Sequence, residues 1–433
     1  MDLDRPKNIF AHILADRRLA VMTGLGFASG IPFPLIYVTQ SAWLSEAGVA
    51  LQTLGLMSEM TIAYKFKFLW APFLDHYDPP LLAGRLGRRR GWIIWSQIAV
   101  MLTLAGVAFG DPAHFLAWTV AFSMALGFAG ATQDVVIDGW RINAAPVERQ
   151  PLMSACAEMG WRTGIACSAG VALAIGGHYG WRLSYLAMAA VMLVGVTACI
   201  FAPEPDVDFH HPPTPKPRPN LFITIIEPIK EMATRLGTMA APIFIMVAGF
   251  RMPGYISSAM AMPLFKSLHY ADAEIAVVTK GFGFVVGLAG VFCASFIARR
   301  IGLMKTLIVG TVAGSASHLS LAWLATHGGG SFWLLATTVS IDNFAAAFAS
   351  IVLISYMSSL TVPELAGGQY ALLTSLCALP GSLLAGSSGF IIENTGFVNF
   401  FVLTSLIGLP VALLSLFVAR RHARDVAAGA QPA

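Results

Sequence analysis

The sequence predicts an all-α membrane protein whose twelve transmembrane helices form two pseudo-symmetric six-helix bundles. Three observations lead to this prediction: recurrent long apolar runs, basic residues that alternate between successive loops, and a repeat between the two halves of the chain. The 433 residues are 56% apolar and only 12% charged, whereas a soluble domain carries about 25% charged residues. This composition indicates a polytopic helical membrane protein.

Apolar runs long enough to cross a bilayer, about 20 residues each, recur along the whole chain. They lie at roughly 19–44, 52–72, 92–109, 115–140, 152–175, 182–202, 237–265, 272–298, 303–324, 331–358, 367–392 and 397–419. Met1 to Arg18 is polar and the first run is too long for a signal-peptide core, so we expect no cleavable signal. All five cysteines fall in apolar runs, where we expect small apolar side chains rather than disulfides.

Basic residues are concentrated in alternate loops. On one side they are Arg5, Lys7, Arg17, Arg18, Arg85, Arg88, Arg89, Arg90, Arg141, Arg149, Lys216, Arg218, Lys230, Arg235, Arg299, Arg300, Lys305, Arg420, Arg421 and Arg424. The opposite loops hold only Arg182 and Lys266. The positive-inside rule therefore predicts that both termini, and the loop after each even-numbered helix, are cytoplasmic. Because topology accounts for the basic residues, the net charge of +4 predicts no nucleic-acid partner.

A cytoplasmic linker is predicted over residues 203–236, between an N-terminal bundle at 1–202 and a C-terminal bundle at 237–433. Its first part is polar and rich in proline, which is typical of extended linkers. His210 and His211 lie in this part. Adjacent linker histidines usually bind nothing, so we predict no metal site and no cofactor.

The two halves also resemble each other. Three pairs of similar segments lie near one offset: 85–90 with 300–305 at 215, 146–148 with 363–364 at 217, and 30–32 with 253–254 near 221. Two parallel six-helix repeats are the architecture of the major facilitator superfamily, in which the substrate site lies between the halves. Gly30, Pro32, Pro253 and Gly254 are interpreted as points where helices 1 and 7 bend around a cavity. Helix packing by small residues is the alternative for these positions.

Four stretches in the first half resemble the AmpG-type muropeptide permeases of that superfamily. They are Ser29 to Pro32, Lys67 to Asp75, Gly87 to Trp92, and Ala131 to Asp138, and the match extends to Asp342-Asn343 and Gln369 to Leu373 in the second half. The resemblance covers nearly the whole chain. It departs at Gly139-Trp140-Arg141, where a small residue, a tyrosine and then an arginine are expected.

This resemblance implies secondary active import of anhydromuropeptides, GlcNAc-1,6-anhydroMurNAc with or without stem peptide, across a bacterial inner membrane. Proton symport with alternating access is the expected mechanism. The expected partners are the small-molecule substrate, protons and the lipid bilayer, and the protein is expected to be a monomer. A permease of the same fold for another anionic solute, such as a siderophore or acyl-CoA, is the alternative.

Few ionisable residues lie within the predicted helices, and a carboxylate there is costly unless it meets a partner, a proton or water. Asp134 and Asp138 are one helical turn apart, so they share a face of helix 4. A rise of about 1.5 Å per residue gives the depth of each group. Lys65, Asp134, Glu158 and Arg162 come out level in the cytoplasmic half, Arg251 and Asp342 near the midplane, and Lys280 towards the periplasm.

These depths suggest roles. A proton-coupled carrier needs a carboxylate that gains and loses a proton as its site dries and wets, and the candidates are Asp134, Asp342 and Glu158. Substrate carboxylates need cations in place of their lost water; an arginine can bind them bidentately, whereas a lysine acts as a point charge. The substrate-binding candidates are Arg251, Lys280, Lys65, Gln133, Arg162, Trp70, Tyr64 and Tyr255. The alternatives are structural pairing, as in an i,i+4 pair of Glu158 and Arg162, and interfacial placement of the tryptophans.

A cytoplasmic gate is predicted next to the basic loop between helices 2 and 3. An acidic residue followed by a glycine and a basic cluster resembles the cytoplasmic signature of the superfamily. The gating candidates are Asp75, Arg88, Arg89, Arg90, Asp138 and Arg141. An enzyme is not expected, because the sequence shows no paired metal ligands and no intramembrane grouping of a nucleophile with a base, and His318 is interpreted as isolated in helix 9. A receptor or channel would not explain the two matched halves.

Overall fold

The computed structural model describes residues 13, 15–50, 61–205 and 221–427, and every regular element in these ranges is a helix. The chain divides into two compact units. Unit 1 comprises residues 1–228 and 362–371, and unit 2 comprises residues 229–361 and 372–433. Each unit buries an apolar core of its own.

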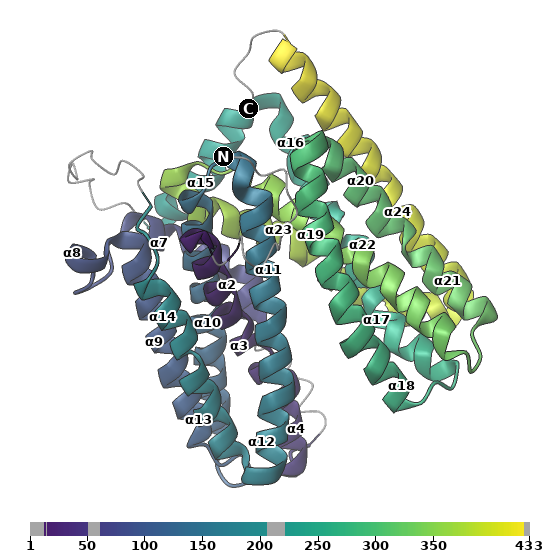
Figure 1. Ribbon diagram of the computed structural model, residues 1–433, viewed down its shortest axis with the longest axis horizontal. Coiled ribbons are helices and arrows are strands. Elements are labelled where there is room, and N and C mark those ends of the chain that lie inside the picture. Colours follow the sequence, from purple (N-terminus) through teal and green to yellow (C-terminus); the bar gives the residue numbers. More distant parts are fainter. Residues whose placement is uncertain (1–12, 14, 51–60, 206–220, 428–433) are drawn as a thin grey trace. The chain divides into compact units, whose positions relative to one another are not determined.

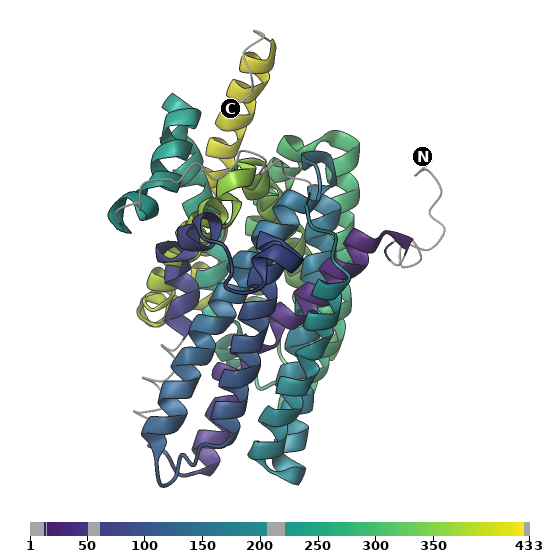
Figure 2. The ribbon, with the colours of Figure 1, turned by 90° about the vertical axis from the view of Figure 1, so that its left-hand side faces the viewer.

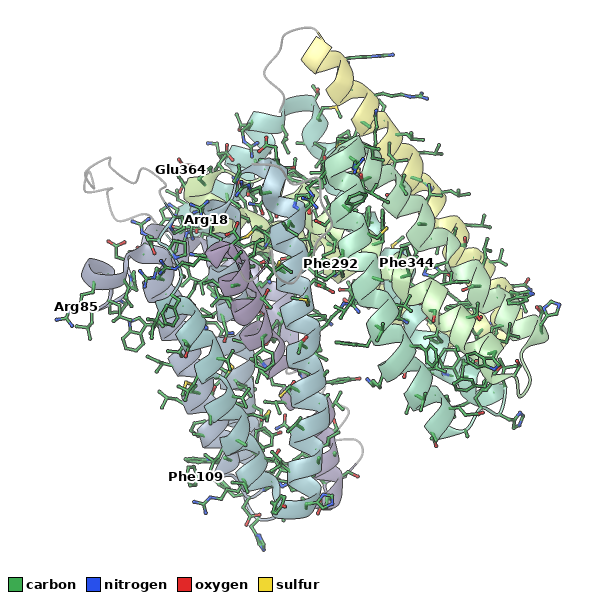
Figure 3. All side chains as sticks on the ribbon, in the orientation of Figure 1. Arg18, Arg85, Phe109, Phe292, Phe344 and Glu364 are labelled. Carbon is green, nitrogen blue, oxygen red and sulfur yellow. The ribbon has the colours of Figure 1, made fainter. Side chains whose placement is uncertain are left out.

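Unit 1 is a bundle of helices that run alongside one another (Figure 1). In chain order they are α2 (Arg17–Gly30), α3 (Pro32–Ile36), α4 (Val38–Glu46), α6 (Ile62–Phe66), η2 (Lys67–Leu69), α7 (Ala71–His76), α8 (Ala83–Leu86), α9 (Arg88–Ala108), α10 (Leu116–Ala144), η3 (Val147–Arg149), α11 (Gln150–Ala166), η4 (Cys167–Val171), α12 (Ala172–Tyr179), α13 (Trp181–Val191) and α14 (Leu193–Ile200). The turned view agrees that α9 and α10 lie side by side (Figure 2). Arg18 and Arg85 lie towards one end of this bundle and Phe109 lies at the other (Figure 3).

Unit 2 contains a second set of helices. They are η5 (Gly237–Met239), α16 (Ala240–Phe250), α17 (Met252–Ser267), α18 (Asp272–Ala276), η6 (Val277–Phe282), α19 (Gly283–Ile301), α20 (Leu303–Ala316), α21 (His318–His327), α22 (Phe332–Ser359) and α24 (Ser388–Ala427). Helices α15 (Leu221–Leu236) and α23 (Ala366–Ala385) contribute residues to both units, and the short η7 (Pro363–Leu365) belongs to unit 1.

Nine helical stretches within the described ranges are long and apolar enough to cross a membrane. They correspond to predicted helices 1, 3, 4, 6 to 10 and 12. Predicted helix 5 corresponds to α11, η4 and α12, and predicted helix 11 to α23. Predicted helix 2 begins in residues 51–60, which lie outside the described residues, as does the linker segment 206–220 with its two histidines. All five cysteines are free thiols.

Helices α2 and α11 pack at backbone contact because each carries two glycines four residues apart. A Cβ on Gly30 would lie 2.3 Å from the carbonyl oxygen of Trp161, and one on Gly160 would lie 2.1 Å from a carbonyl oxygen of α2. Gly26 and Gly164 repeat the arrangement one turn away. Small residues at this spacing let membrane helices approach closely. The packing role, one of the two interpretations of Gly30, is therefore present.

The helices that carry the paired glycine–proline segments are interrupted at those segments. Helix α2 ends at Gly30 and α3 begins at Pro32, which has no N–H to donate to the preceding turn. In unit 2 the interruption falls at Arg251, between α16 and α17, with Pro253 in the first turn of α17. Gly254 has open space where a Cβ would lie, so no close helix contact requires a glycine there.

Candidate functional site

The first candidate site lies in unit 1 and is centred on Asp134 of α10. The hydroxyl of Ser29, on α2, donates to Oδ1 of Asp134 at 2.5 Å. Nζ of Lys67 lies 4.0 Å from Oδ2, and the two charged side chains are 9% and 18% exposed. A charge that is removed from water needs a partner of opposite sign to be tolerated. Asp134 and Lys67 therefore form a largely buried ion pair.

The lysine beside Asp134 is Lys67. The rise per residue along the predicted helices had indicated Lys65 at the depth of Asp134. Helix α6 ends at Phe66, whose φ of −110° and ψ of 11° depart from helical values, and the 3₁₀ turn η2 follows. This change of winding directs Lys67 into the core of unit 1, where it is 7% exposed. Lys65 is only half-buried. An ideal helix cannot place both lysines on one face, so the local break decides which one meets the carboxylate.

Two polar side chains of this part of unit 1, on Gln133 next to Asp134 in the chain and on Tyr64, have buried atoms without hydrogen-bond partners among the described residues. Gln133 is fully buried, and within the described ranges neither its amide nitrogen nor its amide oxygen has a partner. The same holds for the hydroxyl of Tyr64, which interacts electrostatically with Asp134. A Cβ on Gly130 would lie 2.2 Å from that hydroxyl, so the glycine makes room for it. Buried polar groups left unpaired are costly, which makes them candidates to bind water or a ligand.

Three other candidates of unit 1 have partners on their own helix or on a neighbouring one. Nε of Arg162 donates to Oε1 of Glu158 at 2.9 Å, which is the i,i+4 pair expected from the spacing. The indole of Trp70 donates to the hydroxyl of Thr132 at 3.1 Å and packs on Phe128 at 4.6 Å between ring centroids. The ion pair fits the structural interpretation of Glu158 and Arg162, whereas the contacts of Trp70 tie it to α10.

A second polar centre of unit 1 surrounds Asp75 at the end of α7. Asp75 is 3% exposed, and Nη1 of Arg89 donates to its Oδ1 at 2.6 Å. The backbone N–H groups of Gly367 and Gly368 donate to the same carboxylate at 3.2 and 2.6 Å. Nη2 of Arg89 donates to the carbonyl of Pro363 at 3.2 Å. One carboxylate therefore holds the basic loop and the first turn of α23 together.

The remaining basic gating candidates are held by other acceptors. Arg88 donates to Oδ1 of Asp78 at 2.7 Å and to the carbonyl of Asp75 at 2.8 Å. Arg90 donates to the carbonyls of Cys199 and Ile200 at 3.2 and 2.8 Å. These carbonyls belong to the last turn of α14, where a helix exposes unpaired acceptors that favour a cation. Each of the three consecutive arginines thus binds a different set of acceptors, and together they fix the loop.

Arg141 is 1% exposed although it lies close to the end of α10. It donates to Asp138 of the same helix at 3.3 Å, to Oε1 of Gln150 at 3.2 Å and to the hydroxyl of Ser154 at 3.0 Å. Its guanidinium also lies 4.9 Å from the ring centre of Tyr370. Arg141 therefore pairs with Asp138, the other gating candidate on α10, and its bonds to Gln150 and Ser154 tie α10 to α11.

The second candidate site is a cavity of about 280 Å³ in unit 2. Arg251 enters it from the α16–α17 junction, and its Nη2 donates to the hydroxyl of Ser350 on α22 at 2.6 Å. The cavity is lined by Phe250, Arg251, Pro253, Gly254, Tyr255, Ser258, Gly310, Thr311, Gly314, Ser315, His318, Ala346, Ala349 and Ser350. A guanidinium among hydroxyls and small residues can bind an anionic, hydroxylated ligand.

Asp342 and Lys280 lie elsewhere in unit 2. The hydroxyl of Ser317 donates to Oδ1 of Asp342 at 2.9 Å. Lys280 is exposed on the π-helical turn η6 and does not line the Arg251 cavity. The interpretation of His318 as isolated is wrong, because His318 interacts electrostatically with Asp342. Of the three charged candidates in unit 2, only Arg251 lines the cavity.

Three residues of these sites were given no role from the sequence: Lys67, Ser29 and His318. A signal for His318 was available. Helices α21 and α22 are joined by a short connection, so residues at equal distances from it share a depth in the antiparallel pair. His318 lies nine residues before the end of α21 at His327, and Asp342 lies ten residues after the start of α22 at Phe332. No comparable signal selects Lys67, because the break at Phe66 is not evident in the sequence.

The comparisons with known proteins agree with this architecture. The Major Facilitator Superfamily profile matches residues 66–386. The anhydromuropeptide permease of Escherichia coli K12 is 27% identical over 95% of this chain and 82% of its own. The putative transporter AmpG 4 of Rickettsia felis is 28% identical over 95% of this chain and 99% of its own.

Solved structures share the fold at low sequence identity. The proton:xylose symporter XylE, bound to 6-bromo-6-deoxy-D-glucose, has a TM-score of 0.66 at 14% identity and covers 93% of this chain and 95% of that one. The human organic anion transporter MFSD10 has a TM-score of 0.63 at 16% identity and covers 92% and 99%. The predicted fold class and the prediction of a transporter rather than an enzyme are confirmed. The chain therefore belongs to the major facilitator superfamily, as a multi-pass membrane protein that resembles the AmpG-type permeases.

Proposed function

We propose that this chain imports anhydromuropeptides, GlcNAc-1,6-anhydroMurNAc with or without stem peptide, across a bacterial inner membrane by proton symport with alternating access. Both termini are then cytoplasmic, as the basic loops require. The names of the relatives support the substrate class. The observation that carries the mechanism is the largely buried pair of Asp134 and Lys67 within the transmembrane helices of unit 1.

Asp134 is suited to carry the proton because its side chain can be stabilised in two states in a site without water. It can stay ionised against Lys67, with Ser29 donating to it, or it can take up a proton. Small changes in hydration, or in the distance to the lysine, decide between the two states. The hydroxyl of Tyr64, which interacts with Asp134, has no partner in the described ranges and offers a hydrogen bond to water or to a sugar hydroxyl; the buried amide of Gln133 offers two more.

Arg251 is suited to bind the carboxylate of the substrate. A muropeptide carries carboxylates on its lactyl or peptide portion, and their transfer from water requires a cation. The guanidinium of Arg251 lines the unit 2 cavity beside Ser350. Bidentate binding by arginine would fix the orientation of the carboxylate, while the hydroxyls of the cavity face the sugar.

The Asp75 centre suits the cytoplasmic gate. Alternating access requires a set of contacts on the cytoplasmic side that forms in one state and breaks in another. Asp75 binds Arg89 together with two backbone N–H groups at the start of α23. These hydrogen bonds can be exchanged for water without unfolding a helix, because the N–H groups of a first helical turn have no partner inside the helix.

The test of transport is uptake of labelled GlcNAc-1,6-anhydroMurNAc into proteoliposomes under an imposed pH gradient. Wild-type protein should accumulate the sugar, and collapse of the gradient should stop accumulation. Asp134→Asn should abolish gradient-driven uptake while the protein still inserts and folds. The matched control is Asp111→Asn, because Asp111 lies in an exposed loop and its side-chain contacts among the described residues, with His114 and the backbone N–H of Ala113, stay within the same turn. Uptake that ignores the gradient would refute proton coupling, and a siderophore that is taken up in place of the muropeptide would refute the substrate.

The test of the substrate cation compares two ligands. Arg251→Ala should weaken binding of the muropeptide carboxylate much more than binding of an analogue whose carboxylate is converted to an amide. Arg251→Lys should restore part of the affinity, because a lysine supplies the charge without the bidentate geometry. Equal losses for both ligands would show that Arg251 only supports the fold of unit 2.

A further inference from the structure

The unit 2 cavity contains a histidine that neither the predicted site nor the proposed mechanism uses. His318 begins α21, directly after the interruption of the helix at Ser317. It is 4% exposed and lines the same cavity as Arg251. Within the described ranges its Nδ1 has no hydrogen-bond partner. A buried ring nitrogen that lacks a partner, on a residue that lines a cavity with a guanidinium and hydroxyls, is a candidate to bind a group that enters the cavity.

The surroundings of His318 define its chemistry. The ring bonds to the backbone of Thr404 on α24 and interacts electrostatically with Asp342 on α22. Across the cavity lie Arg251 and Tyr255, from the α16–α17 segment. Around the cavity α20 supplies the hydroxyls of Thr311 and Ser315. Among the described residues, the charged groups placed here are the carboxylate of Asp342, which interacts with the ring, and the guanidinium of Arg251, which lines the same cavity.

These two charges act on a protonated histidine in opposite senses. Asp342 favours the imidazolium, and Arg251 opposes it for as long as no anion lies between them. An anion in the cavity offsets the charge of Arg251 and adds a second negative charge next to the ring. Binding of an anion and protonation of the histidine then assist each other, and by linkage each raises the affinity for the other by the same factor.

We propose that His318 is the group that takes up a proton when a carboxylate ligand binds beside Arg251, so that substrate and proton occupy one cavity of unit 2. This inference deepens the proposed function and rests on it. The imidazole Nδ1 accepts the proton and then donates a hydrogen bond to the ligand carboxylate, while Asp342 supplies the counter-charge. In this scheme Asp134 in unit 1 is a separate proton site, and His318 couples the proton to the substrate.

The experiment is titration calorimetry of the purified full chain with GlcNAc-1,6-anhydroMurNAc in buffers of different ionisation enthalpy. The wild type should take up as much as one proton per ligand above neutral pH, and its affinity should fall by up to about tenfold per pH unit in that range. The amide analogue should bind with little proton uptake. His318→Gln should remove both the proton uptake and the pH dependence. The control is His327→Gln, since His327 is the exposed histidine at the other end of α21.

The outcomes distinguish the identity of the proton acceptor from the function of the protein. If His318→Gln keeps the proton uptake of the wild type, His318 is not the acceptor, although the proposed function stands. If the wild type binds neither sugar, the proposed function fails and this inference fails with it. Should His318→Gln unfold on purification, Asp342→Asn provides the second test. That variant keeps the ring but removes its counter-charge, so proton uptake should fall; unchanged uptake would overturn the pairing.

Discussion

The carboxylate of Asp75 offers the sharpest test of how unit 1 is held together, through the substitution Asp75→Asn. The carboxylate is buried and accepts hydrogen bonds from Arg89, Gly367 and Gly368. An asparagine has almost the same shape but carries no charge, and its amide nitrogen donates where a carboxylate oxygen accepted. The guanidinium of Arg89, which is 2% exposed, then lacks its counter-charge, and one of the N–H donors faces another donor.

The expected magnitude follows from these contacts. Removing one partner of a buried ion pair costs about 3–5 kcal/mol, and a buried donor left without an acceptor costs about 1–3 kcal/mol. Nη2 of Arg89 keeps its bond to the carbonyl of Pro363, which limits the loss, so we expect about 3–5 kcal/mol in total. The matched control is Asp78→Asn on the same loop. Asp78 pairs with Arg88 while its side chain is 63% exposed, and an exposed pair contributes about 1 kcal/mol or less.

The assay is denaturant unfolding of the purified protein in one detergent, with Arg89→Gln and the double variant Asp75→Asn/Arg89→Gln completing a cycle. The double variant should be more stable than the sum of the single losses predicts, because neither charge is left buried alone. Equal losses for Asp75→Asn and Asp78→Asn would refute the reasoning. So would strict additivity in the cycle, because it would mean that the two side chains do not interact.

Three further expectations follow from single contacts. Gly160→Val should lower the melting temperature by several degrees, because its Cβ would lie 2.1 Å from a carbonyl oxygen of α2 and overpacking costs about 1–3 kcal/mol. Gly177→Val is the control. It should change the melting temperature much less, because the space at its Cβ is open. Gly130→Ala should reduce muropeptide uptake more than stability. The new Cβ would mainly displace the hydroxyl of Tyr64, which can move but which interacts with Asp134. Gly170→Ala is the control, because the space at its Cβ is open. Burial raises the pKa of Glu204, against the opposing effect of the Arg89 and Arg90 backbone N–H groups. The protonated side chain therefore stabilises the folded state below the ordinary glutamate pKa of about 4.3. This stabilisation is lost as the pH rises through the raised pKa. Melting curves of Glu204→Gln between acid and neutral pH should therefore decline less with rising pH than those of the wild type, and parallel curves would contradict this.

Much of the fold was predictable from the sequence because it depends on composition and periodicity. The bilayer core offers no water to pair backbone polar groups, so long apolar runs such as those of α9, α10 and α22 form helices, which pair these groups within each run. The i,i+4 spacing of Glu158 and Arg162 was enough to predict their ion pair, because both residues lie on one face of one helix.

Contacts between helices were predicted less well. Depth along a helix is a linear measure, and it brought Lys65 level with Asp134. It does not report rotation about the helix axis, and the break at Phe66 altered that rotation in favour of Lys67. Similarly, no sequence pattern links Asp75 with Gly367 and Gly368, which lie almost three hundred residues further along the chain.

The sequence by itself determined that this protein is helical, spans a membrane many times and contains two related halves, because those properties follow from the hydrophobicity and order of the residues. It also determined which few charges are costly enough to be candidates for function. The packing of the helices sets which charges pair, Asp134 with Lys67 and Asp75 with Arg89, and it brings His318 within the electrostatic influence of Asp342. The physical reason is that pairing depends on the rotation and packing of separate helices, and neither quantity is a local property of the chain.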